Sequence, residues 1–283
     1  MKKIATAVFA VVFLLLPLLI GNVLAIKNGA PDGDNHPYVC WIVTWDGASN
    51  YVYLGTGALI APNVVLTAGH VTHDAGGNPI MYAWVSFSPT ASWRPYILDN
   101  DGNIVGLNEG WYEAATWATY TNYRMGGERG ITDWLANDVG ILTLAEPVSI
   151  DPAVLPTTEN YVDTLPTKQG IDLVGYGVQY KATGGGMPPG MDWIDFGYRY
   201  QANAQIIAAN DIFSDDFMRL TANPGQGKGG TCFGDSGSPI LEADTDTILG
   251  VCSWGTNGNC AGVSYEQRID TPDILNWINT FLA

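Results

Sequence analysis

The chain has 283 residues, of which 47% are hydrophobic and 14% are charged, so it holds enough apolar side chains to bury a core. Its 28 Asp and Glu residues outnumber its 12 Lys and Arg residues. The resulting net charge of −16 argues against a nucleic-acid or anionic-membrane partner, because such partners bind clustered basic side chains. The 34 Gly and 16 Pro residues exclude a fold of long helices, since both residue types interrupt helices.

Residues 1–25 have the pattern of a signal peptide. Two lysines near the start are followed by an apolar run over residues 8–20 and by small side chains up to Ala25, the order typical of a segment removed during export. A membrane anchor is the alternative, because the run is close to spanning length, but Pro17 interrupts it. We expect a secreted monomer, extracellular or periplasmic, that begins at Ile26 and has no membrane contact after cleavage.

The exported part of the chain has the pattern of β-structure. Short apolar segments alternate with Gly, Pro, Asn and Asp residues, which end strands, and this alternation is typical of an all-β protein. The predicted strands cover residues 39–44, 51–54, 58–60, 64–66, 82–87, 140–144, 171–174, 198–207, 248–251 and 262–265.

One helix is predicted, over residues 272–282 at the C-terminal end. Thr271 can cap this helix, Pro272 fits its first turn, and apolar side chains recur along one of its faces. Residues 184–190, which are rich in Gly and Pro, are expected to form a mobile surface loop.

Three short segments carry residues that can cooperate in nucleophilic catalysis. Ser236 stands between two glycines in the run GDSGSP, where the backbone can turn tightly and direct N–H groups at a carbonyl oxygen. A serine needs a base, and His70 follows an apolar strand; the base needs an orienting carboxylate, and Asp138 precedes another such strand. The chain order His, Asp, Ser differs from the orders in subtilisin-like enzymes and α/β-hydrolases.

Together with the β-rich pattern, these segments resemble the chymotrypsin (trypsin-like) family of serine proteases, in particular its secreted, bacterial-type members. Further landmarks follow in the family's order. Residues 26–29 resemble the mature amino terminus, residues 173–177 a Gly-aromatic-Gly turn, and residues 253–255 the substrate-binding strand. The resemblance implies one domain over residues 26–283, built of two six-stranded antiparallel β-barrels that meet near residues 150–165, with a C-terminal helix.

The resemblance also assigns the catalytic roles. It implies a serine endopeptidase that acts on polypeptides through a triad of His70, Asp138 and Ser236 and requires no cofactor. The backbone N–H groups of Gly234 and Ser236 would form the oxyanion hole, which binds the negatively charged oxygen of the tetrahedral intermediate.

The resemblance further implies how the enzyme becomes active. In the family, the freed amino group of the first mature residue pairs with the Asp that precedes the catalytic Ser. These residues are Ile26 and Asp235 here. If signal cleavage falls directly after Ala25, the enzyme emerges active; cleavage near Gly21 is the alternative, and it would leave a short tail for a second protease to remove.

The four cysteines suggest disulfides in an exported protein, and their number alone allows three pairings. The resemblance implies a bond between Cys232 and Cys260. It leaves Cys40 and Cys252 either paired with each other or free. Two histidines three residues apart could belong to a metal site, but no CxxC pair accompanies them, so no metal is expected.

The primary pocket, which receives the residue on the acyl side of the cut, is also inferred from the resemblance. In the family, the residue six positions before the catalytic Ser forms the base of this pocket. In this sequence, that residue is Gly230. An uncharged base does not compensate the desolvation of a cation, and glycine walls leave the pocket open, so large apolar or aromatic residues are expected to be preferred. A Glu-directed pocket is the alternative, with Thr231 as a donor. The predicted pocket residues are Gly230, Thr231, Ser253, Trp254, Gly255 and Gly262.

Several features depart from the family pattern. Val71 stands where many members have Cys, Gly69 replaces Ala, and Ser238 replaces Gly. The interval from His70 to Asp138 is long, which predicts an insertion within the Trp-rich segment 81–134. We interpret the tryptophans as packing residues. Two alternatives remain open: an extracellular β-domain that binds glycans through these tryptophans, and a catalytically inactive protease homologue.

Overall fold

The computed structural model describes residues 26–48, 52–73, 77–92, 94–121, 123, 137–178, 180–181, 193–194, 197–210, 216–223, 226–256 and 260–282. The predicted signal peptide and the predicted loop 184–190 lie outside these residues. In the part of the chain that is described, no helix is long and apolar enough to cross a membrane.

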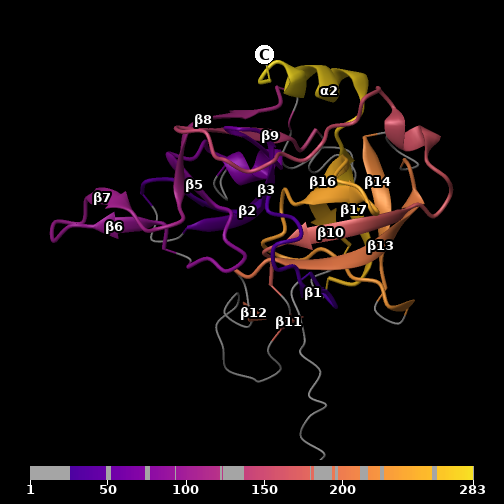
Figure 1. Cartoon of the computed structure of the whole chain (residues 1–283), viewed down its shortest axis with the longest axis horizontal. Helices are drawn as coiled ribbons and strands as arrows, with labels where there is room; N and C mark the ends of the chain where they lie inside the picture. Colours follow the sequence, from indigo (N-terminus) through magenta and orange to yellow (C-terminus); the bar gives the residue numbers. More distant parts are fainter. Residues whose placement is uncertain are drawn as a thin grey trace, which may run out of the picture.

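Six antiparallel strands of the first half close into a barrel (Figure 1). The strands predicted over residues 51–54 and 58–60 contribute residues 53–54 and 58–60 to one strand, β3, while residue 51 lies outside the described residues. A Cβ at Gly57 would lie 2.7 Å from the Val65 side chain and 2.8 Å from that of Ile42, so glycine is needed where β3 crosses the crowded interior. The barrel strands are β2 (Val39–Trp45), β3 (Tyr53–Ala61), β4 (Val64–Thr67), β5 (Tyr82–Ser86), β8 (Tyr112–Thr119) and β9 (Gly140–Leu144).

The second half also forms a ring of six antiparallel strands, and the short strand β1 (Ala30–Pro31) adds to the outside of β13. The ring closes because β13 pairs with both β10 and β14. The all-β prediction, with two six-stranded barrels, is therefore confirmed. These strands are β10 (Gly170–Gly175), β13 (Tyr200–Ala208), β14 (Phe217–Ala222), β15 (Pro239–Glu242), β16 (Ile248–Gly255) and β17 (Gly262–Arg268). Two short strands, β11 (Tyr180–Lys181) and β12 (Trp193–Ile194), pair outside the barrels.

The long interval between His70 and Asp138 contains an additional hairpin. Strands β6 (Tyr96–Leu98) and β7 (Ile104–Leu107) pair only with each other and project away from the first barrel (Figure 1). The described tryptophans of this interval pack inward: Trp84 is buried beside Tyr82, and Trp111 is buried 6.0 Å from the ring of Trp41. Trp93 and Trp134 lie outside the described residues.

The C-terminal helix α2 (Pro272–Asn279) follows the second barrel in the chain but packs on the first. Its Ile274 and Ile278 join the core of the first barrel, and Trp277 contacts Tyr120 edge-on at 5.4 Å. The helix is shorter than predicted. The expected side-chain cap by Thr271 is wrong: no side-chain bond caps the helix, and the Leu275 N–H donates to the Thr271 carbonyl instead.

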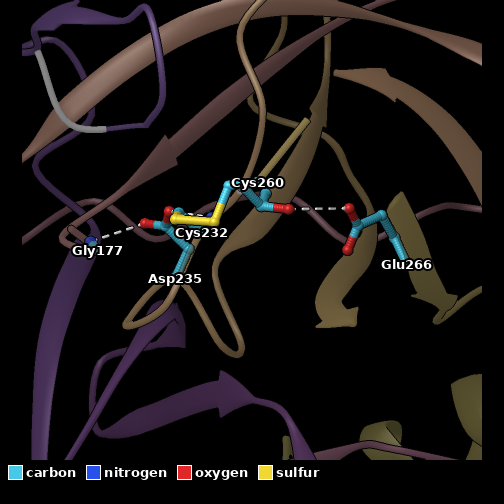
Figure 2. Close-up of a disulfide and its surroundings, with 6 residues drawn as sticks. Gly177, Cys232, Asp235, Cys260 and Glu266 are labelled. Carbon is cyan, nitrogen blue, oxygen red and sulfur yellow. Dashed lines mark hydrogen bonds between the residues drawn. A yellow bond between two sulfur atoms is a disulfide. The ribbon is translucent and has the colours of Figure 1, made fainter. Parts of the chain in front are cut away.

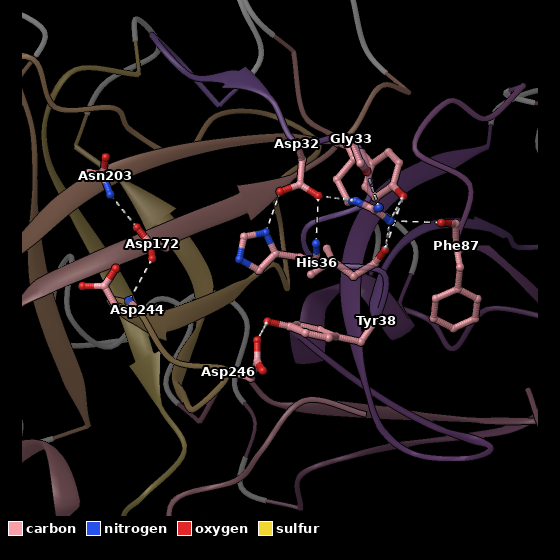
Figure 3. Close-up of polar contacts among 12 residues, drawn as sticks. Asp32, Gly33, His36, Tyr38, Phe87, Asp172, Asn203, Asp244 and Asp246 are labelled. Atoms are coloured by element: carbon pink, nitrogen blue, oxygen red, sulfur yellow. Dashed lines mark hydrogen bonds and ion pairs between the residues drawn. The ribbon is translucent and has the colours of Figure 1, made fainter. Parts of the chain in front are cut away.

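A buried arginine connects the N-terminal segment to both barrels. Its partners Asp32, Gly33 and Phe87 are labelled in Figure 3. Arg199, which directly precedes β13, donates to the Asp32 carboxylate at 2.8 Å and to the carbonyl oxygens of Gly33, Val39 and Phe87 at 2.7, 3.1 and 3.0 Å. Burial alone would raise the pKa of Asp32, but the hydrogen bonds and charges of a neighbouring histidine and of Arg199 hold it below its usual value.

We predict that Arg199→Leu lowers the free energy of unfolding by about 3–5 kcal/mol, because the substitution removes the arginine partner of a buried carboxylate and the donor to three carbonyl oxygens. Urea unfolding at pH 7, in a Ser236→Ala background that prevents self-digestion, measures the loss. Arg94→Leu is the matched control, since Arg94 is exposed and should change stability by less than about 0.5 kcal/mol. An Arg199 variant as stable as this control would contradict the prediction.

Candidate active site

His70 and Asp138 are brought together by the pairing of two strands in the first barrel. Thr67 at the end of β4 lies opposite Gly140 at the start of β9. His70 follows β4 in the 3-10 turn η1 (Gly69–Thr72), and Asp138 directly precedes Val139 and β9. Residues that are 68 positions apart in the chain therefore become neighbours at one end of the barrel.

The Asp138 carboxylate is fully buried and accepts hydrogen bonds from both barrels. His70 contributes two contacts, one from its backbone N–H and one between its Nδ1 and an Asp138 oxygen, each at 2.8 Å. Ser253 on β16 of the second barrel donates its hydroxyl at 2.6 Å. The backbone N–H of Asp138 donates to the buried amide oxygen of Gln267 at 3.0 Å. These contacts hold the imidazole in a fixed orientation, with Nε2 as the nitrogen that remains for a substrate-side partner.

The environment of His70 favours its protonated form. Burial would lower the pKa of His70, but the charge of Asp138 and the hydrogen bond to it raise the pKa above 6.5. A raised pKa makes this imidazole a stronger base, which is what removal of a proton from a serine hydroxyl requires.

Ser236 lies in a turn that two glycines make possible. Gly234 and Gly237 have φ values of 94° and 82°, which favour glycine. A Cβ at Gly237 would lie 2.1 Å from the Thr67 hydroxyl, so the turn could not approach β4 with any other residue there. His70 and Ser236 line the same cavity.

The first barrel holds this turn through a residue that the sequence did not single out. Thr56 on β3 donates its backbone N–H to the Ser236 carbonyl at 2.8 Å and its hydroxyl to the Gly234 carbonyl at 2.9 Å. The N–H of Gly237 donates to the Cys252 carbonyl on β16 at 2.8 Å. The turn is therefore clamped between the two barrels.

Two backbone N–H groups of the turn remain available to a ligand. Within the described part of the chain, those of Gly234 and Ser236 have no acceptor, whereas the N–H of the intervening Asp235 donates to the Cys232 carbonyl at 3.0 Å. Two free N–H groups separated by one intervening residue can bind one negatively charged oxygen.

Next to Ser236 lies a cavity of about 450 Å³. Four of the six predicted pocket residues line it, namely Thr231, Ser253, Trp254 and Gly255. The other lining residues are His70, Cys232, Phe233, Ser236, Cys252 and Cys260. Gly230 and Gly262 are not among the lining residues: Gly230 abuts Ala222, and Gly262 lies opposite Ala222 in the β14–β17 ladder.

The disulfide implied by the resemblance is present. Cys232 and Cys260 are bonded, with Cα atoms 5.2 Å apart, and both line the cavity (Figure 2). Cys40 and Cys252 are free and buried, one in each barrel, so they do not form a second bridge. Among the described residues, no three His, Cys, Asp or Glu side chains gather as metal ligands.

Asp235 is fully buried near the side chain of Ile26. Its carboxylate accepts N–H groups of Gly177 and Cys232, each at 2.8 Å (Figure 2). Desolvation nevertheless raises the pKa of Asp235 to about 7. Ile26 is also fully buried, and a Cβ at Gly175 would touch both the Asp235 carboxylate and the Ile26 side chain. The Asp235 carboxylate and the Ile26 side chain, from the two residues predicted to form the activation pair, therefore both lie close to Gly175.

A comparison with protein-family models matches residues 32–278 to Trypsin. The chain belongs to the trypsin family of serine endopeptidases. It is similar to Brachyurin from Leptuca pugilator, with 23% identity over 266 residues that cover 93% of this chain and 97% of that protein.

Solved structures of other proteins share the trypsin-family fold with this chain. An HL collagenase has a TM-score of 0.66 at 17% identity, over 90% of this chain and 98% of that chain. The human heparin binding protein has a TM-score of 0.59 at 17% identity, over 90% of this chain and 96% of that chain. At these identities, the likeness establishes the two-barrel fold.

We predict that Asp138→Asn lowers the pKa of His70, because the desolvation that depresses it remains while the charge that raises it is removed. NMR titration of the histidine Cε1–H signals measures this pKa in the Ser236→Ala background. His36, which contacts Asp32 in a separate network, supplies the signal of a second histidine as the internal control. An unchanged or higher His70 pKa in the Asn variant would show that Asp138 does not set the basicity of this imidazole.

Proposed function

We propose that this trypsin-family protein is a secreted endopeptidase that cleaves peptide bonds through an acyl-enzyme formed on Ser236. The observation that carries the proposal is the convergence, at one cavity, of Ser236, of a His70 imidazole held by a buried Asp138, and of two unpaired N–H groups. An inactive homologue would have no need for this complete set.

In the proposed mechanism, the Ser236 hydroxyl oxygen attacks the scissile carbonyl carbon, and its proton passes to Nε2 of His70. The imidazolium formed is stabilised by Asp138. The same proton is then given to the leaving amine as the C–N bond breaks, which leaves an ester on Ser236. Water, deprotonated by His70, hydrolyses this ester and regenerates the enzyme.

The oxyanion of each tetrahedral intermediate would accept the N–H groups of Gly234 and Ser236. One such donor is typically worth about 3 kcal/mol of transition-state stabilisation. The clamp by Thr56 supports this role, because it holds the carbonyl groups of the same two residues and so orients the turn before substrate binds.

We propose that activation depends on release of the Ile26 amino group. In the complete chain this nitrogen belongs to the peptide bond with Ala25. Cleavage there would create an ammonium group that could pair with the buried Asp235 carboxylate, whose pKa is raised by desolvation. The new ion pair would favour the ionised carboxylate and fix the turn that follows it.

The open cavity beside Ser236 supports a preference for large apolar or aromatic residues on the acyl side of the cut. Trp254, Gly255 and the disulfide supply walls without charge. Secretion is proposed from the predicted signal peptide, and the Cys232–Cys260 bond supports it because disulfides persist in oxidising compartments.

Ser236→Ala should abolish covalent labelling by an active-site organophosphate and lower kcat by several orders of magnitude, because only the nucleophile is lost. Mass spectrometry of the labelled protein and hydrolysis of a peptide amide measure the two effects. Ser238→Ala is the matched control, because the buried Ser238 hydroxyl has no hydrogen-bond partner among the residues that the structure describes. Full turnover by the Ser236 variant, or no labelling of the wild-type chain, would contradict the proposed function.

An Ala inserted before Ile26 in the mature protein should lower kcat/KM about a hundredfold or more, because it moves the ammonium group away from the buried Asp235. An Ala appended after Ala283 is the control and should leave kcat/KM unchanged. Equal activity of the extended and the authentic amino termini would argue against the proposed activation.

A further inference from the structure

The inner end of the active-site cavity is formed by three buried residues. Of the ten lining residues, only Thr231, Cys252 and Ser253 are buried, whereas Phe233 near the mouth is 55% exposed. All three contact the same side chain, Glu266 on β17, which is itself fully buried directly behind them. The sequence pattern did not draw attention to Glu266.

The contacts of Glu266 are specific. The Thr231 hydroxyl donates to one carboxylate oxygen at 3.3 Å, and the backbone N–H of Ser253 donates to the other at 3.1 Å. This N–H faces Glu266 because the β16–β17 register shifts at Ser253. Cys252, opposite Glu266 in the ladder, adds its thiol.

Glu266 has no cationic partner within the described part of the chain. The buried arginines are committed elsewhere, Arg199 to Asp32 and Arg268 to Asp270 and Asp163. An ionised carboxylate in this position is therefore charged, desolvated and uncompensated, a state that a cation arriving through the cavity would stabilise.

We propose that Glu266 is a specificity-determining residue of the primary pocket, and that its carboxylate favours Lys or Arg on the acyl side of the cut through the Thr231 hydroxyl. This inference rests on the proposed function. The Thr231 oxygen donates its proton to Glu266 and keeps lone pairs that can accept an N–H from the substrate's ammonium or guanidinium group. The negative charge behind the hydroxyl strengthens that hydrogen bond.

The protonation state of Glu266 then sets the preference. Burial raises the pKa of Glu266 to about 7, against the opposing effect of its hydrogen bonds. With Glu266 protonated, the inner end is neutral and apolar or aromatic residues are favoured, as the sequence predicted. With Glu266 ionised, Lys and Arg become substrates as well.

The groups that face Glu266 from neighbouring elements do not supply a competing cation. Asp235, in the turn before β15, interacts with Glu266 as a like charge. Cys252 on β16 stays a neutral thiol, because burial raises its pKa well above 9. On β14 the residue opposite Glu266 is the uncharged Met218, and on β17 itself the Ser264 hydroxyl makes a hydrogen bond with Glu266.

Two peptide substrates that differ only in Arg or Phe at the cleaved residue test the proposal. We expect the ratio of their kcat/KM values, Arg over Phe, to rise about ten- to a hundredfold between pH 6 and pH 9, the range typical of a hydrogen bond to a charged group. Ionisation of His70 affects both substrates alike and cancels in the ratio. In Glu266→Gln the ratio should stay flat and low, while cleavage after Phe persists.

Two further variants keep the test decisive. Thr231→Val removes the hydroxyl between Glu266 and the cavity, and should lower the Arg-to-Phe ratio at pH 9 even if the Gln variant folds poorly. Glu242→Gln is the matched control: Glu242 lies on β15 of the same barrel, bonds to Tyr161, and should leave the ratio unchanged.

The outcomes separate this inference from the proposed function. A wild-type ratio that does not change with pH, or a Glu266→Gln ratio that follows the wild type, would overturn the role of Glu266 while both substrates are still cleaved. A loss of Phe cleavage equal to the loss of Arg cleavage in the Gln variant would indicate a purely structural role and overturn it as well. No hydrolysis of either substrate together with no labelling of Ser236 would overturn the proposed function and this inference with it.

Discussion

The site depends on one fully buried carboxylate, that of Asp138, which accepts hydrogen bonds from both barrels. His70 comes from the first barrel, and Ser253 comes from the second. Because a buried charge is costly without partners, the two barrels must dock in the geometry that satisfies it. The same docking sets the Ser236 turn, through Thr56 on one side and the Cys252 carbonyl on the other.

Two other buried acids make the stability of the second barrel depend on pH. Asp235 and Glu266 have pKa values of about 7, well above those of exposed carboxyl groups, because of desolvation. The folded state therefore binds their protons more tightly than the unfolded state does. Each of the two groups therefore contributes about 3 to 4 kcal/mol to the free energy of unfolding at low pH. This contribution is fully present below about pH 4 and is lost as the pH rises to about 7. A free amino group at Ile26 would offset this loss for Asp235, and a cationic substrate would offset it for Glu266.

Ser253 links these acids. Its hydroxyl donates to Asp138 and its backbone N–H donates to Glu266, so one residue of β16 contacts the carboxylate that orients His70 and the carboxylate behind the pocket. Ser253 therefore connects the carboxylate that supports catalysis with the carboxylate proposed to set the selectivity of the cavity. Substitutions that keep the size and shape of the side chain, such as Glu266→Gln, therefore test the role of Glu266 most cleanly. A larger change at Glu266 would also displace Ser253 and, through it, Asp138.

Much of the site was accessible from the sequence because its signals are local. Ser236 between two glycines, His70 at the end of one apolar strand and Asp138 at the start of another need only short segments to be recognised, and strand pairing then brings their ends together. The C-terminal helix was predicted for the same reason, although the role of Thr271 as a side-chain cap was wrong.

Other features were decided by tertiary structure, because their signals are not local. The barrel strands β8, β14 and β15 and the hairpin of β6 and β7 were missed, since strands without a continuous apolar run are defined by the strands they pair with. In the sequence, Glu266 looks like an ordinary polar residue of a strand. Only the closed second barrel turns its carboxylate inward, behind the cavity beside Ser236, where burial gives it a raised pKa and no cation.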